Sequence, residues 1–221
     1  LRELTGGIYF GKKGRLDNGN TAFDTCTYTR EEIKRLAIKG YELAMKRSKR
    51  LCCVDKANVL ESSRLWRETV QSLEKDYPSV KVSYEFVDAV AMRLVQWPNS
   101  YDVLITENLF GDILTDEASV ISGSMGLMPS ASVGLKTSLY EPIHGSYPQA
   151  AGKDIANPLA TILSAAMMFE DTFNLHEEAN LIRSVVDLSL EKSIVTEDIA
   201  NGAKAYKTSE IGNWLAKEIL T

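Results

Sequence analysis

Three apolar runs, each ending in polar or charged residues, constrain the fold of this chain more than any other feature. Each resembles a β-strand, and they span residues 51–56, 80–88 and 101–108. Helical patterns separate them, at about 29–47, with Thr29 as the expected N-cap, and at about 62–76. Strands that alternate with helices predict an α/β sheet.

Ligands in open α/β sheets bind beyond the carboxyl ends of the strands. Lys56, Asn58, Asp88 and Asp112 all fall at or just after the ends of the three apolar runs. We therefore expect three strand ends to converge on one site. Randomly placed charges would scatter over both edges of the sheet.

Three aspartates predict a divalent-metal site. Asp88 ends an apolar run, and Asp112 and Asp116 lie four residues apart. If a helix begins at Gly111, the i, i+4 pair projects from one face, and both carboxylates can reach one hard cation. An oxygen-only set suits Mg²⁺ or Mn²⁺ better than zinc. The alternative is the solvated face of a surface helix, but the apolar neighbours favour buried acids that need a counter-ion.

Composition places the chain among ordinary globular proteins. It has 221 residues, 44% of them hydrophobic, enough for one large core or two modest ones. A net charge of −5 argues against a nucleic-acid or anionic-membrane binder. No segment is apolar over the roughly 18 to 20 residues of a membrane span, and no leader opens the chain. Three cysteines, two of them adjacent in an apolar run, favour the reducing cytoplasm.

Glycine and turn residues divide the chain. The segment 6–27 is interrupted by glycines and holds an Asp-Asn-Gly turn, so it predicts a protruding β-hairpin arm. A partner subunit would cover such an arm, although a mobile surface loop is an equally simple interpretation. Small residues near 121–134 mark a boundary. We therefore expect a central domain at 1–122 and a second domain at 123–221.

The second domain offers a loop histidine. His144 lies between a proline turn and Gly145-Ser146, where the backbone can approach a ring or a phosphate, although most loop histidines are ordinary hydrogen-bonding residues. Walker loops, Gly-x-Gly-x-x-Gly after a strand and nucleophile elbows are absent. Asn157 is expected to cap an apolar helix that has Pro158 in its first turn and runs to about Phe173. Two further helices are expected, over about 175–192 and from 208 to the end.

Four segments together resemble the β-decarboxylating dehydrogenases, the isocitrate and isopropylmalate dehydrogenase family. They are residues 2–11, 54–60, 110–116 and 141–146. The resemblance covers essentially the whole chain. It implies two α/β domains with a protruding β-arm. Because the chain starts at Leu1, as if in the middle of a strand, the resemblance also implies that the N-terminal half of the nucleotide-binding domain is missing.

The resemblance implies a reaction. A member of this family oxidises a 2-hydroxy acid with NAD⁺ and then releases a carboxylate as CO₂, with Mg²⁺ or Mn²⁺ bound. Asp112 and Asp116 match the family's metal ligands, and Asp88 matches the ligand that comes from the other subunit of a homodimer. Lys56, also delivered across the dimer, matches the lysine that helps remove the hydroxyl proton. Tyr28 matches the tyrosine that returns a proton to the enol carbon.

The substrate implied by the resemblance is of the isopropylmalate type. Asn58 and Val59 follow that pattern rather than the isocitrate one, and Arg2 matches an arginine that clamps substrate carboxylates. The product would be 4-methyl-2-oxopentanoate, in leucine biosynthesis. Tartrate or malate, isocitrate and homoisocitrate remain alternatives. A non-enzymatic alternative is that this chain alone is an inactive dimerisation module, and we expect it to be weakly active at best.

The cofactor residues implied by the resemblance lie in the second domain, and they are Glu141, His144, Gly145, Ser146, Gln149 and Asn157. Gln149 departs from the family, because NAD-using relatives usually carry an aspartate there that binds the adenosine ribose. NADP-using isocitrate relatives place a lysine and a tyrosine at the corresponding pair, which here is Gln149-Ala150. NAD⁺ is therefore the expected cofactor.

Overall fold

The computed structural model describes residues 1–220. The chain divides into two compact units, Leu1–Ala118 and Ser119–Thr221. The boundary lies a few residues before the one expected from the small residues near 121–134. Each unit has its own hydrophobic core.

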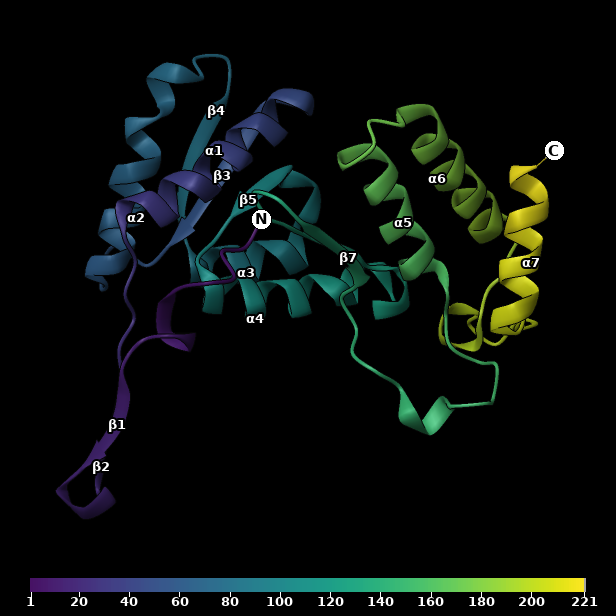
Figure 1. Ribbon diagram of the computed structural model, residues 1–221, viewed down its shortest axis with the longest axis horizontal. Helices are drawn as coiled ribbons and strands as arrows, with labels where there is room; N and C mark the ends of the chain where they lie inside the picture. The colour runs from purple at the N-terminus through teal and green to yellow at the C-terminus, as the bar shows by residue number, and fades with distance from the viewer. Residues whose placement is uncertain (221) are drawn as a thin grey trace. The chain divides into compact units, whose positions relative to one another are not determined.

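A parallel sheet forms the centre of the first unit. Its strands are β3 (Arg50–Asp55), β4 (Lys81–Phe86) and β5 (Val103–Ile105), in the order β4-β3-β5 (Figure 1). The three strands that the apolar runs predicted are therefore present and adjacent. The third is shorter than predicted, since the chain turns into a helix at Asn108.

Helices cover both faces of this sheet. Helices α1 (Arg30–Lys46) and α2 (Glu61–Ser72) pack on the face that receives Leu51 and Cys53, and α3 (Val87–Gln96) packs on the face that receives Cys52. Successive strand residues point to opposite faces, so one strand supplies both cores. Thr29 caps α1 as predicted: its hydroxyl accepts from the backbone N–H of Glu32, whose carboxylate accepts from the backbone of Thr29.

Two predictions about where strands end and helices begin at the carboxyl edge of the sheet were wrong. Asp88 does not end a strand but lies in the first turn of α3. The next helix, α4 (Asn108–Ser119), begins three residues before Gly111. Glu107 accounts for this earlier start, because its carboxylate accepts from the backbone N–H of Phe110. Gly111 instead allows α4 to pack closely against Thr106, since a Cβ at position 111 would lie 2.3 Å from the Thr106 hydroxyl.

The predicted hairpin is present within the segment 6–27. Strands β1 (Lys13–Leu16) and β2 (Thr21–Asp24) pair antiparallel and project from the first unit (Figure 1). The turn between them includes Asn18 and Gly19 at φ of 56° and 93°, values that glycine and asparagine tolerate best. The start of the segment is a single 3₁₀ turn, η1 (Gly7–Tyr9).

The second unit combines a β-hairpin with three helices. Strands β6 (Pro129–Val133) and β7 (Ser138–Pro142) pair antiparallel and contact α5. The helices are α5 (Leu159–Asp171), α6 (His176–Glu191) and α7 (Thr208–Ile219), close to the three predicted spans. Strand β6 was not predicted, because its serines and alanine lack the β-branched and aromatic side chains that identify strands. Over residues 1–220, no helix is long and apolar enough to cross a membrane.

Candidate active site

Asn108 is the centre of a hydrogen-bond network at the carboxyl edge of the β4-β3-β5 sheet. Its side-chain oxygen accepts from Arg2 Nε and Nη2 at 3.0 and 2.8 Å, and its amide nitrogen donates to the Gly6 carbonyl at 3.2 Å. Its backbone N–H donates to Tyr28 Oη at 2.9 Å. Only 2% of Asn108 is exposed. One buried residue at the start of α4 therefore fixes both Arg2 and Tyr28.

Tyr28 is held on every side. Its hydroxyl donates to Glu107 Oε2 at 2.9 Å, and its ring meets Trp66 edge-on at a centroid distance of 5.3 Å. Gly7 lies beneath the hydroxyl at a φ of 76°, and a Cβ there would lie 2.2 Å from Oη. Burial raises the pKa of Tyr28 well above its ordinary value. The Asn108 N–H lowers it, whereas the charge and hydrogen bond of Glu107 raise it further. Tyr28 is therefore a neutral phenol in a fixed orientation.

Arg2 links this network to the first predicted metal ligand. Its Nη1 lies 2.6 Å from Asp112 Oδ1, and Tyr9 donates its hydroxyl to Asp112 Oδ2 at 2.9 Å. The hydrogen bond to Asp112 raises the pKa of the Tyr9 phenol. Both oxygens of Asp112 therefore have partners, and an unbroken set of contacts runs from Tyr28 to Asp112.

A second group lies where β3 ends. Lys56 Nζ lies 2.5 Å from Asp88 Oδ1, and this contact lowers the pKa of Asp88. The preceding Asp55 is 1% exposed and accepts from Arg67 Nε and Nη2 at 2.8 and 3.0 Å. It also accepts from the backbone N–H of Ala57 at 2.9 Å. The Asp55–Arg67 pair therefore anchors the turn that presents Lys56.

The predicted metal ligands are more accessible than expected. Asp112 is half-buried, whereas Asp116 and Asp88 are exposed. The expectation of buried like charges on α4 was therefore wrong, because Ile113 points to solvent and is 55% exposed. Within residues 1–220, no three histidine, cysteine or acidic side chains gather into a metal-binding group. The carboxylate chemistry suits Mg²⁺, but Asp112 and Asp116 supply only part of an octahedral set.

The predicted specificity residues follow Lys56. Asn58 and Val59 are both exposed in the turn before α2, and Val59 has 61% of its surface accessible. Their side chains are available to a ligand.

The predicted cofactor residues of the second unit are mostly exposed. Glu141 is exposed on β7, Gly145 and Ser146 are exposed beyond it, and the His144 ring makes a hydrogen bond of 3.0 Å with the carbonyl of its neighbour. Gln149 is exposed in a short 3₁₀ turn. These side chains are accessible.

Asn157 is the exception among the cofactor candidates. Its oxygen accepts from the Leu159 N–H at 3.0 Å, although the N-cap of α5 is Pro158, one residue after the predicted cap, and its nitrogen donates to Asp198 at 3.1 Å. Both ends of the amide therefore have partners within the protein.

Sequence reasoning did not assign Glu107, Asn108 or Tyr9 to the site. Glu107 and Asn108 were visible as polar residues after the third apolar run, the same signal that identified Lys56 and Asp88. Tyr9 carried no such signal, because its contact with Asp112 depends on the path of the chain through η1.

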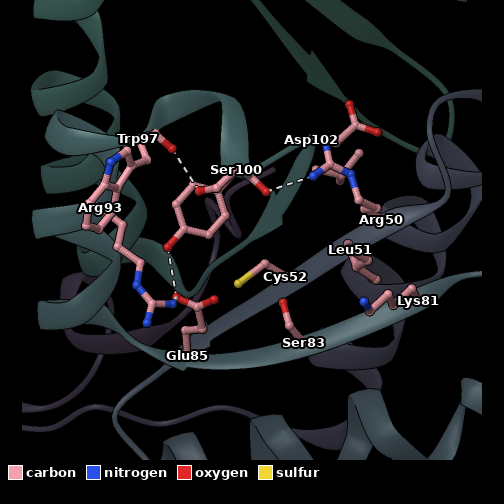
Figure 2. Close-up of a pocket in the computed structure, with 12 residues that line it drawn as sticks. Arg50, Leu51, Cys52, Lys81, Ser83, Glu85, Arg93, Trp97, Ser100 and Asp102 are labelled. Atoms are coloured by element: carbon pink, nitrogen blue, oxygen red, sulfur yellow. Dashed lines mark hydrogen bonds and ion pairs between the residues drawn. The ribbon is translucent and has the colours of Figure 1, made fainter.

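A cavity of about 500 Å³ lies elsewhere, on the face of the same sheet that α3 covers, and it reaches from the amino ends of β3 and β5 to Glu85 near the end of β4. Figure 2 shows Glu85 and Arg93 on one side of it and Arg50 on the other. Three of its charged side chains already have partners: Glu85 Oε2 accepts from Arg93 at 2.6 Å and from Tyr101 at 2.8 Å, and Arg50 donates to the carbonyl of Ser100 at 3.0 Å. The cavity is therefore a weaker candidate than the carboxyl edge.

Comparison with known proteins gives a consistent result. The sequence pattern of the family described as "Isocitrate/isopropylmalate dehydrogenase" matches residues 1–215. A 3-isopropylmalate dehydrogenase of Desulfitobacterium hafniense is 54% identical over 96% of this chain, and one of Bacteroides fragilis is 54% identical over 99%. The chain spans 61% and 62% of the lengths of these two relatives.

Solved structures agree. A crystal structure of isocitrate dehydrogenase from Methylococcus capsulatus is similar over 100% of this chain and 66% of its own, with a TM-score of 0.92 and 32% identity. A β-decarboxylating dehydrogenase from Thermococcus kodakarensis matches over 99% of this chain and 63% of its own, with a TM-score of 0.88 and 36% identity.

Proposed function

Because the chain belongs to the isocitrate/isopropylmalate dehydrogenase family, we propose that the protein is an NAD⁺-dependent 3-isopropylmalate dehydrogenase of leucine biosynthesis. It oxidises the C2 hydroxyl by hydride transfer to NAD⁺ and releases the β-carboxylate as CO₂, which leaves 4-methyl-2-oxopentanoate. One observation carries the proposal: the continuous contacts that join Tyr28, Asn108, Arg2 and Asp112 at the carboxyl edge of the sheet.

Arg2 and Tyr28 of this network, together with Lys56, have roles in the proposed reaction. Arg2 binds a substrate carboxylate, and its contact with the Asp112 carboxylate supports this role, because a guanidinium fork that holds one carboxylate can hold another. Lys56 removes the hydroxyl proton. Tyr28 then donates its proton to the enol carbon after CO₂ leaves.

The metal in this proposal is Mg²⁺ or Mn²⁺. Asp112 and Asp116 of one chain and Asp88 of a second copy would hold it. When bound, the cation polarises the substrate hydroxyl and carboxylate and stabilises developing negative charge.

A second copy of this chain is the proposed partner. Lys56 and Asp88 form a pair in one chain, and Asp88 does not join Asp112 and Asp116 in a three-acid group among the described residues. The outer surfaces of α3 and α4 also expose apolar side chains, including Met92 at 62% and Val95 at 65%. Association through these helices would cover that surface and bring the Lys56–Asp88 pair to the other copy's α4.

NAD⁺ is the proposed cofactor, bound by the accessible segment around His144. Gln149 and Ala150 offer no cation to a 2′-phosphate, which favours NAD⁺ over NADP⁺. The protein acts in the cytoplasm in this proposal. Cys52 and Cys53 are free and buried, as a reducing compartment would leave them.

The test of the reaction is NADH formation with Mg²⁺ in a version of the protein that has the full family length. We expect turnover of 3-isopropylmalate to exceed that of isocitrate, homoisocitrate, tartrate and malate, and NAD⁺ to exceed NADP⁺. Preference for a substrate without the isopropyl group would overturn the proposed substrate. Absence of turnover with every substrate would overturn the proposed activity.

The test of the shared site is complementation between two inactive variants. Lys56→Ala and Asp112→Asn are unfolded together and refolded as a mixture. Half of the dimers are then mixed, and each mixed dimer has one intact site if Lys56 crosses to the partner. We expect about a quarter of wild-type activity, by the symmetry of a two-site dimer. No recovery in a mixture shown to contain mixed dimers would contradict the shared site.

A further inference from the structure

Two of the proposed metal ligands are already paired with cationic side chains of their own unit. Asp112 Oδ1 lies 2.6 Å from Arg2 Nη1, and Asp88 Oδ1 lies 2.5 Å from Lys56 Nζ. The proposed reaction assigns a substrate carboxylate to Arg2 and the hydroxyl proton to Lys56. The same two cations therefore have one set of partners in this chain and another in the proposed reaction.

In both pairs the carboxylate is the more accessible partner. The Asp112 side chain is 43% exposed and that of Arg2 27%, and the Asp88 side chain is 64% exposed and that of Lys56 26%. Buried Asn108 also holds Arg2 through Nε and Nη2, which leaves Nη1 to contact Asp112. A cation from solvent can therefore reach both carboxylates while Arg2 keeps its anchor.

Charge gives a physical reason for the two pairs. The proposed site brings Asp112 and Asp116 of one copy together with Asp88 of the other, and three carboxylates at one place repel one another when no cation is bound. Arg2 and Lys56 offset two of these three negative charges. A divalent cation supplies the same two positive charges, so it can replace the side chains without changing the net charge of the acids and their counter-ions.

We propose that Arg2 and Lys56 are the counter-ions of the metal-free site, and that metal binding releases both side chains from the carboxylates to the substrate. This inference rests on the proposed function. The metal and the two side chains compete for the same carboxylates, so each side chain weakens metal binding when substrate is absent. When substrate is present, the released side chains bind it instead. Metal and substrate therefore strengthen each other's binding, since such coupling is reciprocal.

Lys56→Gln and Arg2→Gln are the test variants. Glutamine removes the positive charge but can still donate a hydrogen bond to a carboxylate. Lys56→Arg and Arg2→Lys are the matched controls, because they keep the charge and change the shape of the side chain. Lys39→Gln controls for the net charge of the protein, since Lys39 pairs with Glu42 on the surface of α1.

The measurement is the Kd of Mn²⁺ for the protein of full family length, from the electron paramagnetic resonance signal of the free ion. Without substrate, we expect each glutamine variant to lower this Kd about 5-fold, because a positive charge that repels the ion is gone. The three control variants should stay within about 2-fold of the wild type. With saturating 3-isopropylmalate the advantage of the glutamine variants should disappear, because the substrate then lacks one of the released cations.

Asp112→Asn separates this inference from the proposed metal site. If Asp112→Asn binds Mn²⁺ as tightly as the wild type, the metal site fails and the inference falls with it. If Asp112→Asn loses Mn²⁺ but either glutamine variant binds the ion no more tightly than the wild type without substrate, the metal site stands and the inference is overturned. Weaker binding in the glutamine variants would show that Arg2 and Lys56 only orient the carboxylates.

Discussion

The carboxyl edge of the β4-β3-β5 sheet and the α3 face of the sheet, where the cavity of Figure 2 lies, use their charged side chains differently. Around the cavity, Glu85 and Arg93 pair with each other and are partly buried. At the carboxyl edge, Arg2 pairs with Asp112 and Lys56 with Asp88, and the carboxylates of Asp88 and Asp116 are exposed.

The difference shows that cavity size and site chemistry are separate properties. The α3 face has a cavity, but burial raises the pKa of the Cys52 thiol that lines it to about 11, so the thiol is unreactive near neutral pH. The carboxyl edge has little enclosed volume in this chain, but it joins an orientated phenol, a guanidinium and accessible carboxylates. This combination makes the carboxyl edge the candidate site.

The largest expected effect is a loss of turnover that is confined to variants of the carboxyl edge. Asp112→Asn should lower turnover of the proposed substrate at least about 100-fold, because an amide is a poor ligand for Mg²⁺ and no longer balances Arg2. Initial rates across a Mg²⁺ titration measure it. The control is Glu85→Gln beside the cavity on the α3 face, which should retain wild-type turnover. Equal losses in the two variants would remove the functional distinction between the two regions.

The next effect concerns the anchor beneath Lys56. Asp55→Asn should reduce the free energy of unfolding by about 2–3 kcal/mol, because Arg67 loses its buried partner while keeping partial access to water. Urea denaturation measures the change. Glu61→Gln is the matched control on the same helix as Arg67. Its pair with Arg64 is on the surface, so the expected loss is below about 0.5 kcal/mol. A loss as large as that of Asp55→Asn would contradict the account.

The smallest effect lies at the amino edge and depends on pH. Hydrogen bonds from Ser48, with Arg47, lower the pKa of Asp102 to about 2. Because the folded-state pKa lies below the unfolded value of about 3.9, this stabilisation is fully present above that value and is lost as the pH falls toward 2. Asp102→Asn should therefore cost under about 1 kcal/mol at pH 6, and the difference should narrow by pH 3. A pH-independent difference would contradict the assigned cause.

Sequence reasoning located the carboxyl edge but not the contacts within it. The apolar runs predicted the three parallel strands because buried parallel strands read as continuous hydrophobic segments. Polar residues after each run then placed Lys56 and Asp112 at a common edge.

The errors have physical causes. Asp88 was assigned to a strand because an apolar run does not reveal where a strand turns into a helix. The burial of Asp112 and Asp116 was inferred from apolar neighbours, but α4 turns one of those neighbours, Ile113, to solvent. Tyr9 and Asn108 were missed because their partners lie about a hundred residues away in the chain, and no local pattern encodes such a contact.

Gly7 and Tyr28 impose a rule on how the sequence can vary. A Cβ at position 7 would lie 2.2 Å from the phenol oxygen and 2.7 Å from the ring carbon that bears it. Replacing tyrosine with phenylalanine removes the first conflict and leaves the second, and the left-handed backbone at Gly7 disfavours any larger residue. A larger residue at position 7 is therefore expected only in sequences that have lost the ring at position 28, whereas position 28 can change while position 7 stays glycine.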